Sequence, residues 1–241
     1  MKINSLTLVL IAVVALMGVQ SAQAVSVPLT EDSQLNPWND GGDGSDGAST
    51  ELYSWQDVGS PPQSTWLEFD LSSITNTITA ATLTVINIDG QPAGNVGAGN
   101  PTIDLLGFND GSTGEDFDEG AMTFNNAPDN GSAGNPYVIG GSSGEYTLLD
   151  TQIVTTPNDL TANSAGLVSF LNADTNGVAT FILRKGLVAS GENGKYPVWA
   201  SQDNTVVSGA TLDVTVVPEP SSLALLGAAL VGLALIRRKR G

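Results

Sequence analysis

The 241-residue sequence has no cysteine and no histidine, and it has only eight lysine and arginine residues against 25 aspartate and glutamate residues. Without cysteine no disulfide can stabilise the fold, so the hydrophobic core must do so alone. Without histidine or cysteine, Ser-His-Asp and Cys-His nucleophiles and the usual zinc sites are excluded. An enzyme with this composition could use only carboxylate, tyrosine or lysine chemistry.

Positive charge is scarce in the central part of the chain. Residues 25–217 hold 24 of the 25 acidic residues but only three basic ones, Arg184, Lys185 and Lys195, which gives this segment a net charge of −21. A surface of that sign repels phosphate backbones, so nucleic acid and anionic lipid are poor partners. It favours divalent cations, and it keeps an exported protein soluble.

Residues 1–24 have the pattern of a secretory signal peptide. Lys2 precedes an apolar stretch at 6–17, and the small residues Ala22 and Ala24 form a cleavage site. We therefore expect export by the general secretory route, cleavage after Ala24, and a mature body at 25–217. A body of this length is enough for one domain with a substantial core.

The C-terminal segment 218–241 combines a Pro-Glu-Pro motif, an uncharged apolar stretch and a basic cluster, in that order. These parts are Pro218, Glu219 and Pro220, then 223–236, then Arg237, Arg238, Lys239 and Arg240. The fourteen apolar residues would form a helix of ~21 Å, which is shorter than the ~30 Å hydrocarbon core of a bilayer. The basic cluster is expected to hold its side of the membrane in the cytoplasm.

This order resembles the PEP-CTERM sorting signal of Gram-negative bacteria, which a membrane protease of the exosortase type recognises. The resemblance implies a transmembrane helix that anchors the chain in the inner membrane at least transiently. It also implies a cut near the Pro-Glu-Pro motif and delivery of the body to the cell surface or the extracellular matrix. An ordinary single-span anchor is the alternative interpretation.

The body has the pattern of short β-strands. Asp-Gly and Asn-Gly pairs mark tight turns, and apolar residues alternate between them with a period of two. In 64–71, Leu67 and Phe69 share one face and Trp66 and Glu68 the other, which predicts a half-buried strand with an acidic wet side. Further strands are expected at 78–88, 178–184, 212–216, 51–55, 103–108, 146–154 and 196–201, and one helical turn at 165–172.

Eight or more short strands predict an all-β protein, a single antiparallel β-sandwich with jelly-roll topology as the first choice. The segments 64–74, 78–83, 122–128 and 198–216 resemble, in order, parts of the DNRLRE domain family. Phe124 stands where that family has tryptophan, and its usual Ser-Arg-Glu is replaced by Ser-Gln-Asp at 201–203. The resemblance implies a secreted jelly-roll module related to carbohydrate-binding modules.

Two acidic segments are candidate sites. Asp40, Asp43 and Asp46 lie three residues apart among glycines, a composition that could hold calcium, the one cofactor that the sequence suggests. A flexible acidic loop is the alternative. The second segment is interpreted first as a solvated loop and, in the alternative, as a cation site or the acid and base of a glycosidase. Its acids are Asp110, Glu115, Asp116, Asp118 and Glu119.

Aromatic rings can stack on the apolar face of a sugar. Trp55 and Trp66 are the candidate sugar platforms, although simple packing is the alternative for both. Because Trp66 lies opposite the face of Leu67 and Phe69, we expect it to point outward or to lie under a covering loop.

Together these features predict a non-catalytic exported protein of the cell surface or extracellular matrix, a carbohydrate-binding or structural module associated with exopolysaccharide. One alternative is an enzyme acting on polysaccharide, either a lyase or a carboxylate glycoside hydrolase. The absence of histidine and the scarcity of lysine and arginine argue against a lyase. A second alternative is a purely structural or adhesion component.

Overall fold

The structure, a computed structural model, describes residues 21–36, 47–55, 63–88, 101–112, 114–127, 145–155, 158–185 and 196–217. In these ranges the chain forms eleven strands and one helix. They are β1 (Gln23–Val27), β2 (Leu29–Leu35), β3 (Glu51–Tyr53), β4 (Ser64–Asp70), β5 (Thr77–Val85), β6 (Thr102–Phe108), β7 (Tyr146–Ile153), β8 (Leu160–Ala162), α2 (Ala165–Ala173), β9 (Val178–Lys185), β10 (Val198–Ala200) and β11 (Thr211–Val217).

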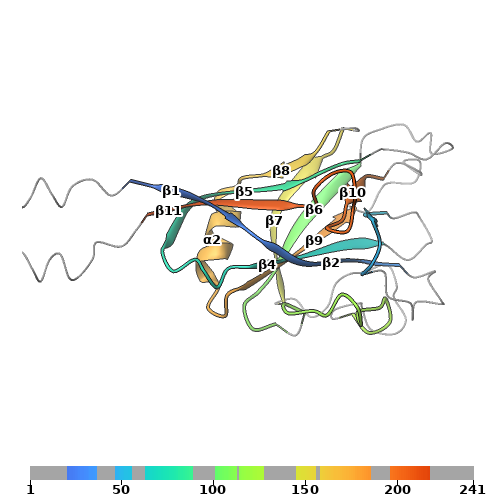
Figure 1. Cartoon of the computed structure of the whole chain (residues 1–241), viewed down its shortest axis with the longest axis horizontal. Helices are drawn as coiled ribbons and strands as arrows, with labels where there is room; N and C mark the ends of the chain where they lie inside the picture. The colour runs from blue at the N-terminus through green and yellow to red at the C-terminus, as the bar shows by residue number, and fades with distance from the viewer. Residues whose placement is uncertain are drawn as a thin grey trace, which may run out of the picture.

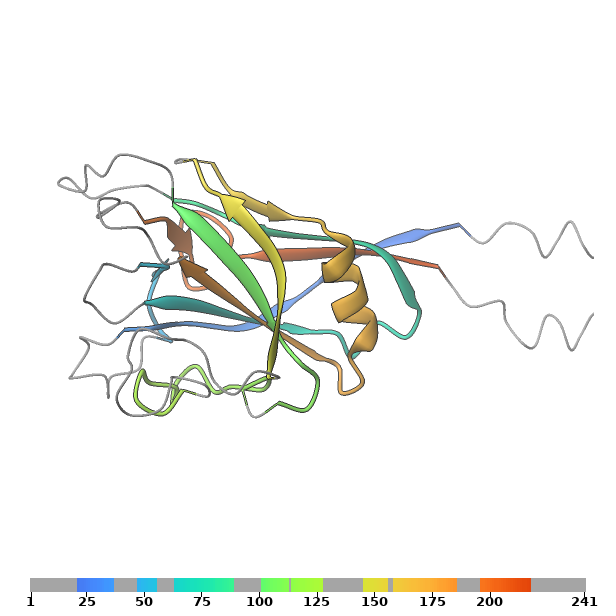
Figure 2. The same cartoon turned by 180° about the vertical axis from the view of Figure 1, so that it is seen from behind.

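The strands form three sheets with the orders β1-β11-β5-β8, β2-β4-β9-β6-β7 and β10-β3 (Figures 1 and 2). Every strand pair among the described residues is antiparallel. The prediction of a mostly β protein built from antiparallel sheets is therefore confirmed. All eight expected strands are present, with ends that differ by a few residues.

Three strands were not expected. β1 overlaps the predicted signal peptide, β8 has only three residues, and β2 reads Leu-Thr-Glu-Asp-Ser-Gln-Leu. The polar residues of β2 hide the alternation that marks a strand, because several of them are buried: Asp32 and Ser33 are 0% exposed.

The two larger sheets share one hydrophobic core. Leu83 of β5 and Leu212 of β11 belong to the same buried cluster as Phe69 of β4 and Phe181 of β9. The rings of Phe69 and Phe181 meet edge to face, with centroids 5.8 Å apart. The strands β4, β9 and β11 supply alternate residues to this core, as the period of two predicts.

The helical turn expected at 165–172 is the helix α2. Ser164 caps it, and its Oγ accepts a hydrogen bond from the Leu167 amide at 3.1 Å. Leu167 and Leu171 pack into the shared core. Asp174 follows the last residue of α2 as its C-cap, which places an acid at the edge of the core.

The prediction that one face of β4 is exposed to solvent is wrong. Trp66 is 0% exposed and Glu68 only 6%, because the segment after β6 covers this face. Phe117 and Met122 of that segment form a second buried cluster with Trp66 and Phe108. Acidic residues at alternate positions therefore did not mark a solvent-exposed face, because Glu68 lies beneath a covering loop.

The two ends of the described body lie side by side. β1 is an edge strand that pairs with β11, with Gln23 opposite Val216 (Figure 1). Ala22 and Ala24 are exposed. A cut after Ala24 would fall inside β1 and would leave residues 25–27 paired with β11.

Two glycines allow a matched test of this packing. A Cβ on Gly107 of β6 would lie 2.6 Å from Phe170 Cε2 and 2.9 Å from Leu149 Cδ1, whereas one on Gly166 of α2 would meet nothing closer than 3.4 Å. We expect Gly107→Ala to lower the free energy of unfolding by about 1–3 kcal/mol. Gly166→Ala should raise it by up to ~1 kcal/mol, because alanine favours a helix.

Urea unfolding of the purified variants measures both effects. A Gly107→Ala protein as stable as the parent would show that Phe170 and Leu149 do not pack against β6 as described.

Candidate functional site

The acidic residues of the loop after β6 lie in different parts of the structure. Asp110 and Glu115 approach Asp174, which follows α2, whereas Glu119 approaches β2. Asp116 and Asp118 are exposed, as expected of a solvated loop. Glu115 is only 2% exposed, so the interpretation of the whole segment as solvated is wrong for this residue.

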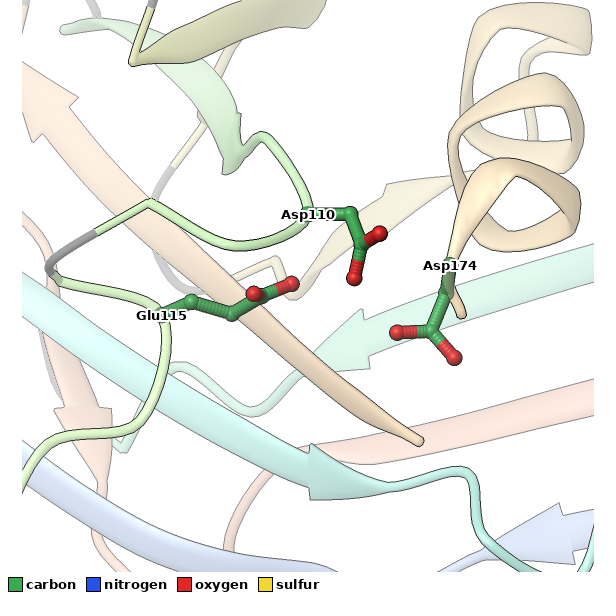
Figure 3. A group of neighbouring side chains, drawn as sticks. All are labelled: Asp110, Glu115 and Asp174. Atoms are coloured by element: carbon green, nitrogen blue, oxygen red, sulfur yellow. The ribbon is translucent and has the colours of Figure 1, made fainter. Parts of the chain in front are cut away.

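Asp110, Glu115 and Asp174 form a cluster of three carboxylates. One oxygen from each side chain lies within 4.8 Å of those of the other two. Figure 3 shows the three side chains pointing into the same space, two from the loop after β6 and one from the end of α2. Sequence reasoning missed Asp174, because no local pattern links it to a loop sixty residues earlier in the chain.

Neighbouring donors hold these carboxylates in place. The Gly111 amide donates to Glu115 Oε2 at 2.6 Å, and Asn176 Nδ2 donates to the same oxygen at 2.8 Å. The Thr175 hydroxyl donates to Asp110 Oδ2, and the Gly177 amide donates to Asp174 Oδ2 at 3.0 Å. Gly111 and Gly177 have φ of +76° and +85°, a backbone conformation that glycine adopts at little cost.

Burial raises the pKa of Glu115 and of Asp174 above the ordinary value of a carboxyl group. The charge of Asp110 raises both further, while the hydrogen bonds from Gly111 and Gly177 lower them in part. The folded chain therefore holds mutually repelling carboxylates close together and partly out of water.

A second group of buried acids connects β2 with distant loops. Asp32 is 0% exposed, and its Oδ2 accepts a hydrogen bond from the Gln202 amide at 2.6 Å. Glu119 Oε2 accepts from the Asp32 amide at 3.0 Å and from Gln202 Nε2 at 2.7 Å. Burial raises the pKa of Asp32 to about 7, and the charges of Glu119 and Asp203 contribute.

Glu68 of β4 holds the covering loop in place. Its Oε2 accepts a hydrogen bond from the Phe117 amide at 3.2 Å, and its Oε1 accepts from Thr30 Oγ1 at 3.0 Å. Burial raises the pKa of Glu68 to about 7, with Glu31 and Asp116 contributing. These acids act as acceptors that fasten loops to strands.

The two predicted sugar platforms have different environments. Trp66 is 0% exposed, its ring lies against Phe108 and Phe117, and its Nε1 donates to Ser64 Oγ at 3.1 Å. Neither face of Trp66 is open to a ligand, so it is corrected to a packing residue under the covering loop.

Trp55 is only partly buried. It meets Tyr196 edge to face with ring centroids 6.4 Å apart, and Tyr53 meets Tyr196 at 5.9 Å. These three rings, the aromatic group, lie beside β3 and β10.

Several predicted residues lie outside the part of the chain that the structure describes. They are Asp40, Asp43, Asp46, Pro218, Glu219, Pro220, Arg237, Arg238, Lys239 and Arg240. The apolar stretch 223–236 lies outside it as well. Among the described residues, none of the helical segments has the length and hydropathy needed to cross a bilayer.

The fold and its ends define a mostly β protein with its first and last strands paired. A family model for the PEP-CTERM protein-sorting motif matches residues 216–240. No curated protein matches the sequence. The motif indicates that this is an exported protein sorted by exosortase, a membrane protease, with a C-terminal tail that is transiently anchored in the membrane.

The raised pKa values predict a pH dependence of stability. Asp32 and Glu68 have pKa values of about 7 in the folded protein and about 4 in an unfolded chain. Between these values the folded state binds more protons, so the stability from this source is complete below pH ~4 and is lost as the pH rises to ~7. We expect the free energy of unfolding to fall by on the order of 5 kcal/mol from pH 5 to pH 8, about half of it from each group.

Urea unfolding at the two pH values measures the fall. Asp32→Asn should reduce it, whereas Asp213→Asn, which removes one exposed acid from β11, should not. Equal pH dependence in both variants would contradict the assignment to Asp32.

Proposed function

We propose that this protein is a non-catalytic module of the cell surface or extracellular matrix that associates with exopolysaccharide. The observation that carries the proposal is the sorting motif, whose match begins at Val216, inside β11. The last strand of the body therefore contains the first residues of the motif match. The strongly acidic composition of the body is consistent with an exported protein.

The strand order supports the relationship to secreted jelly-roll modules. The sheets β1-β11-β5-β8 and β4-β9-β6-β7, the latter extended by β2 at its edge, have the order of the two four-stranded sheets of a jelly roll. Successive strands also cross from one sheet to the other, from β4 to β5 to β6 and from β7 to β8 to β9. We infer that the body is a single jelly-roll sandwich and that its resemblance to the DNRLRE family is structural.

The aromatic group is the proposed glycan contact. Figure 1 shows β10, which pairs with β3, at the end of the molecule opposite the start of β1 and the end of β11. Because the tail follows β11, it joins the body at the end opposite the aromatic group. Trp55 and Tyr196 are partly exposed there, as a ring that stacks on a sugar must be.

Two other functions remain as alternatives. An enzyme that acts on polysaccharide would have to use the carboxylates described above, and release of reducing sugar or unsaturated product would identify it. A purely structural component would retain no glycan at all, with or without calcium.

Processing is tested on the tail. Replacement of Pro218, Glu219 and Pro220 by alanine should prevent cleavage of the tail. The protein in the membrane fraction should then have a mass that includes the whole tail. The unchanged protein should instead yield, from the envelope or medium, a mass that lacks both 1–24 and most of 218–241. Intact masses from cell fractions measure this, and a parent protein that keeps both ends and is found in the cytosol would contradict the proposal.

Glycan binding is tested on Trp55. Trp55→Ala should weaken retention on the bound polysaccharide by about tenfold, because an aromatic contact contributes about 0.5–1.5 kcal/mol. The control is Val206→Ala, since Val206 is an apolar residue that is 87% exposed and is not part of the aromatic group. A Trp55→Ala protein that binds as the parent does would exclude the aromatic group as the contact.

A further inference from the structure

We propose that Asp110, Glu115 and Asp174 bind one calcium ion between the loop after β6 and the end of α2. The oxygens of the three side chains lie within 4.8 Å of one another (Figure 3). Calcium binds oxygens at ~2.3–2.6 Å, so two ligands on opposite sides of the ion lie ~4.8 Å apart and two adjacent ones lie closer. The spacing therefore suits one ion held by all three side chains.

One buried, unpartnered oxygen, Asp174 Oδ1, points to a ligand. Asp174 Oδ1 is buried and accepts no hydrogen bond. The side chain of Glu115 belongs to a residue that is 2% exposed, and both hydrogen bonds that it accepts go to Oε2. A buried carboxylate oxygen without a donor or a cation is costly, and native structures rarely leave one unexplained.

The described part of the protein supplies no cation of its own for this site. Its one salt bridge joins Arg184 to Asp104 at 3.2 Å, across β9 and β6. Lys and Arg residues in the described ranges make no ion pair with Asp110, Glu115 or Asp174. A bound cation from solution would offset the repulsion of the three carboxylates.

The ligand chemistry selects the class of ion. Three carboxylates are hard oxygen ligands, which suit calcium or magnesium rather than a metal that prefers nitrogen or sulfur. Magnesium requires ligands at ~2.0–2.1 Å in near-octahedral geometry and usually keeps several waters, so a set of protein carboxylates favours calcium. The donors from Gly111, Asn176 and Gly177 hold Oε2 of Glu115 and Oδ2 of Asp174, which leaves the second oxygen of each carboxylate as a candidate ligand.

The proposed ion would link Asp110 and Glu115 to Asp174 across the fold. Thr180 of β9 already donates its hydroxyl to the backbone oxygen of Glu115. With calcium bound, the loop that covers Trp66 would be fixed at its start as well as at Phe117. The proposed ion would stabilise the fold of the exported protein, and this effect does not depend on the proposed glycan association.

The test uses the processed protein purified from the cells that export it, freed of metal by a chelator. Millimolar calcium should raise the melting temperature by about 5 °C, and magnesium should raise it less. Titration calorimetry should show one calcium site in the parent protein and none in Asp174→Asn. Asp174→Asn should lose the shift, whereas Asp213→Asn, an exposed acid of β11, should keep it.

A second readout separates ligation from a structural role. In chelator, Asp174→Asn should melt at or above the temperature of the parent, because it removes one of the repelling charges. A melting temperature unmoved by calcium in the parent, together with no binding heat, would overturn the proposal. A shift that survives in Asp174→Asn but is lost in Asp43→Asn would place the ion in the 39–47 loop instead, which also overturns it.

Discussion

The fold depends on buried carboxylates that accept hydrogen bonds from backbone amides far away in the chain. Glu68 accepts from Phe117, Asp32 accepts from Gln202, and Glu119 accepts from the Asp32 amide. Each bond attaches a loop to β2 or β4, in a chain that has no disulfide to do so. A loop held in this way covers Trp66, and the central strands β4 and β9 are buried on both faces. The acidic composition thus serves the interior as well as the surface.

The neutral residue at position 202 helps to explain why these acids are held with raised pKa values. Gln202 is the uncharged residue whose backbone and side chain both contact these acids. Its side-chain amide donates to Glu119 Oε2 at 2.7 Å but carries no charge to offset Asp32 and Glu119. Desolvation of Asp32 is therefore left uncompensated, and its pKa rises to about 7. The same argument applies to the cluster of Asp110, Glu115 and Asp174, to which no described lysine or arginine forms a salt bridge.

Sequence patterns predicted the strands well and the sites poorly, for a physical reason. Alternation of apolar residues located β4, β9 and β11, because each has one face in the shared core. It failed for β2, where buried acids and amides replace apolar residues, and it mistook Glu68 for a sign of water. The sites depend on contacts between distant segments, such as Asp110 with Asp174. No spacing within one segment records such a contact, whereas the sorting motif at 216–240 is contiguous and could be found from the sequence.

The pairing of the first and last strands connects the targeting signals with the shape of the body. Because Gln23 lies opposite Val216, the segment before β1 and the sorting tail after β11 join the sheet at the same end. A cut in β1 shortens an edge strand, which loses two residues of pairing and leaves β11 held by β5 on its other side. A cut after β11 removes nothing from the sheet. Both ends can therefore be processed without disturbing the core, and the aromatic group at the opposite end stays unaffected by either cut.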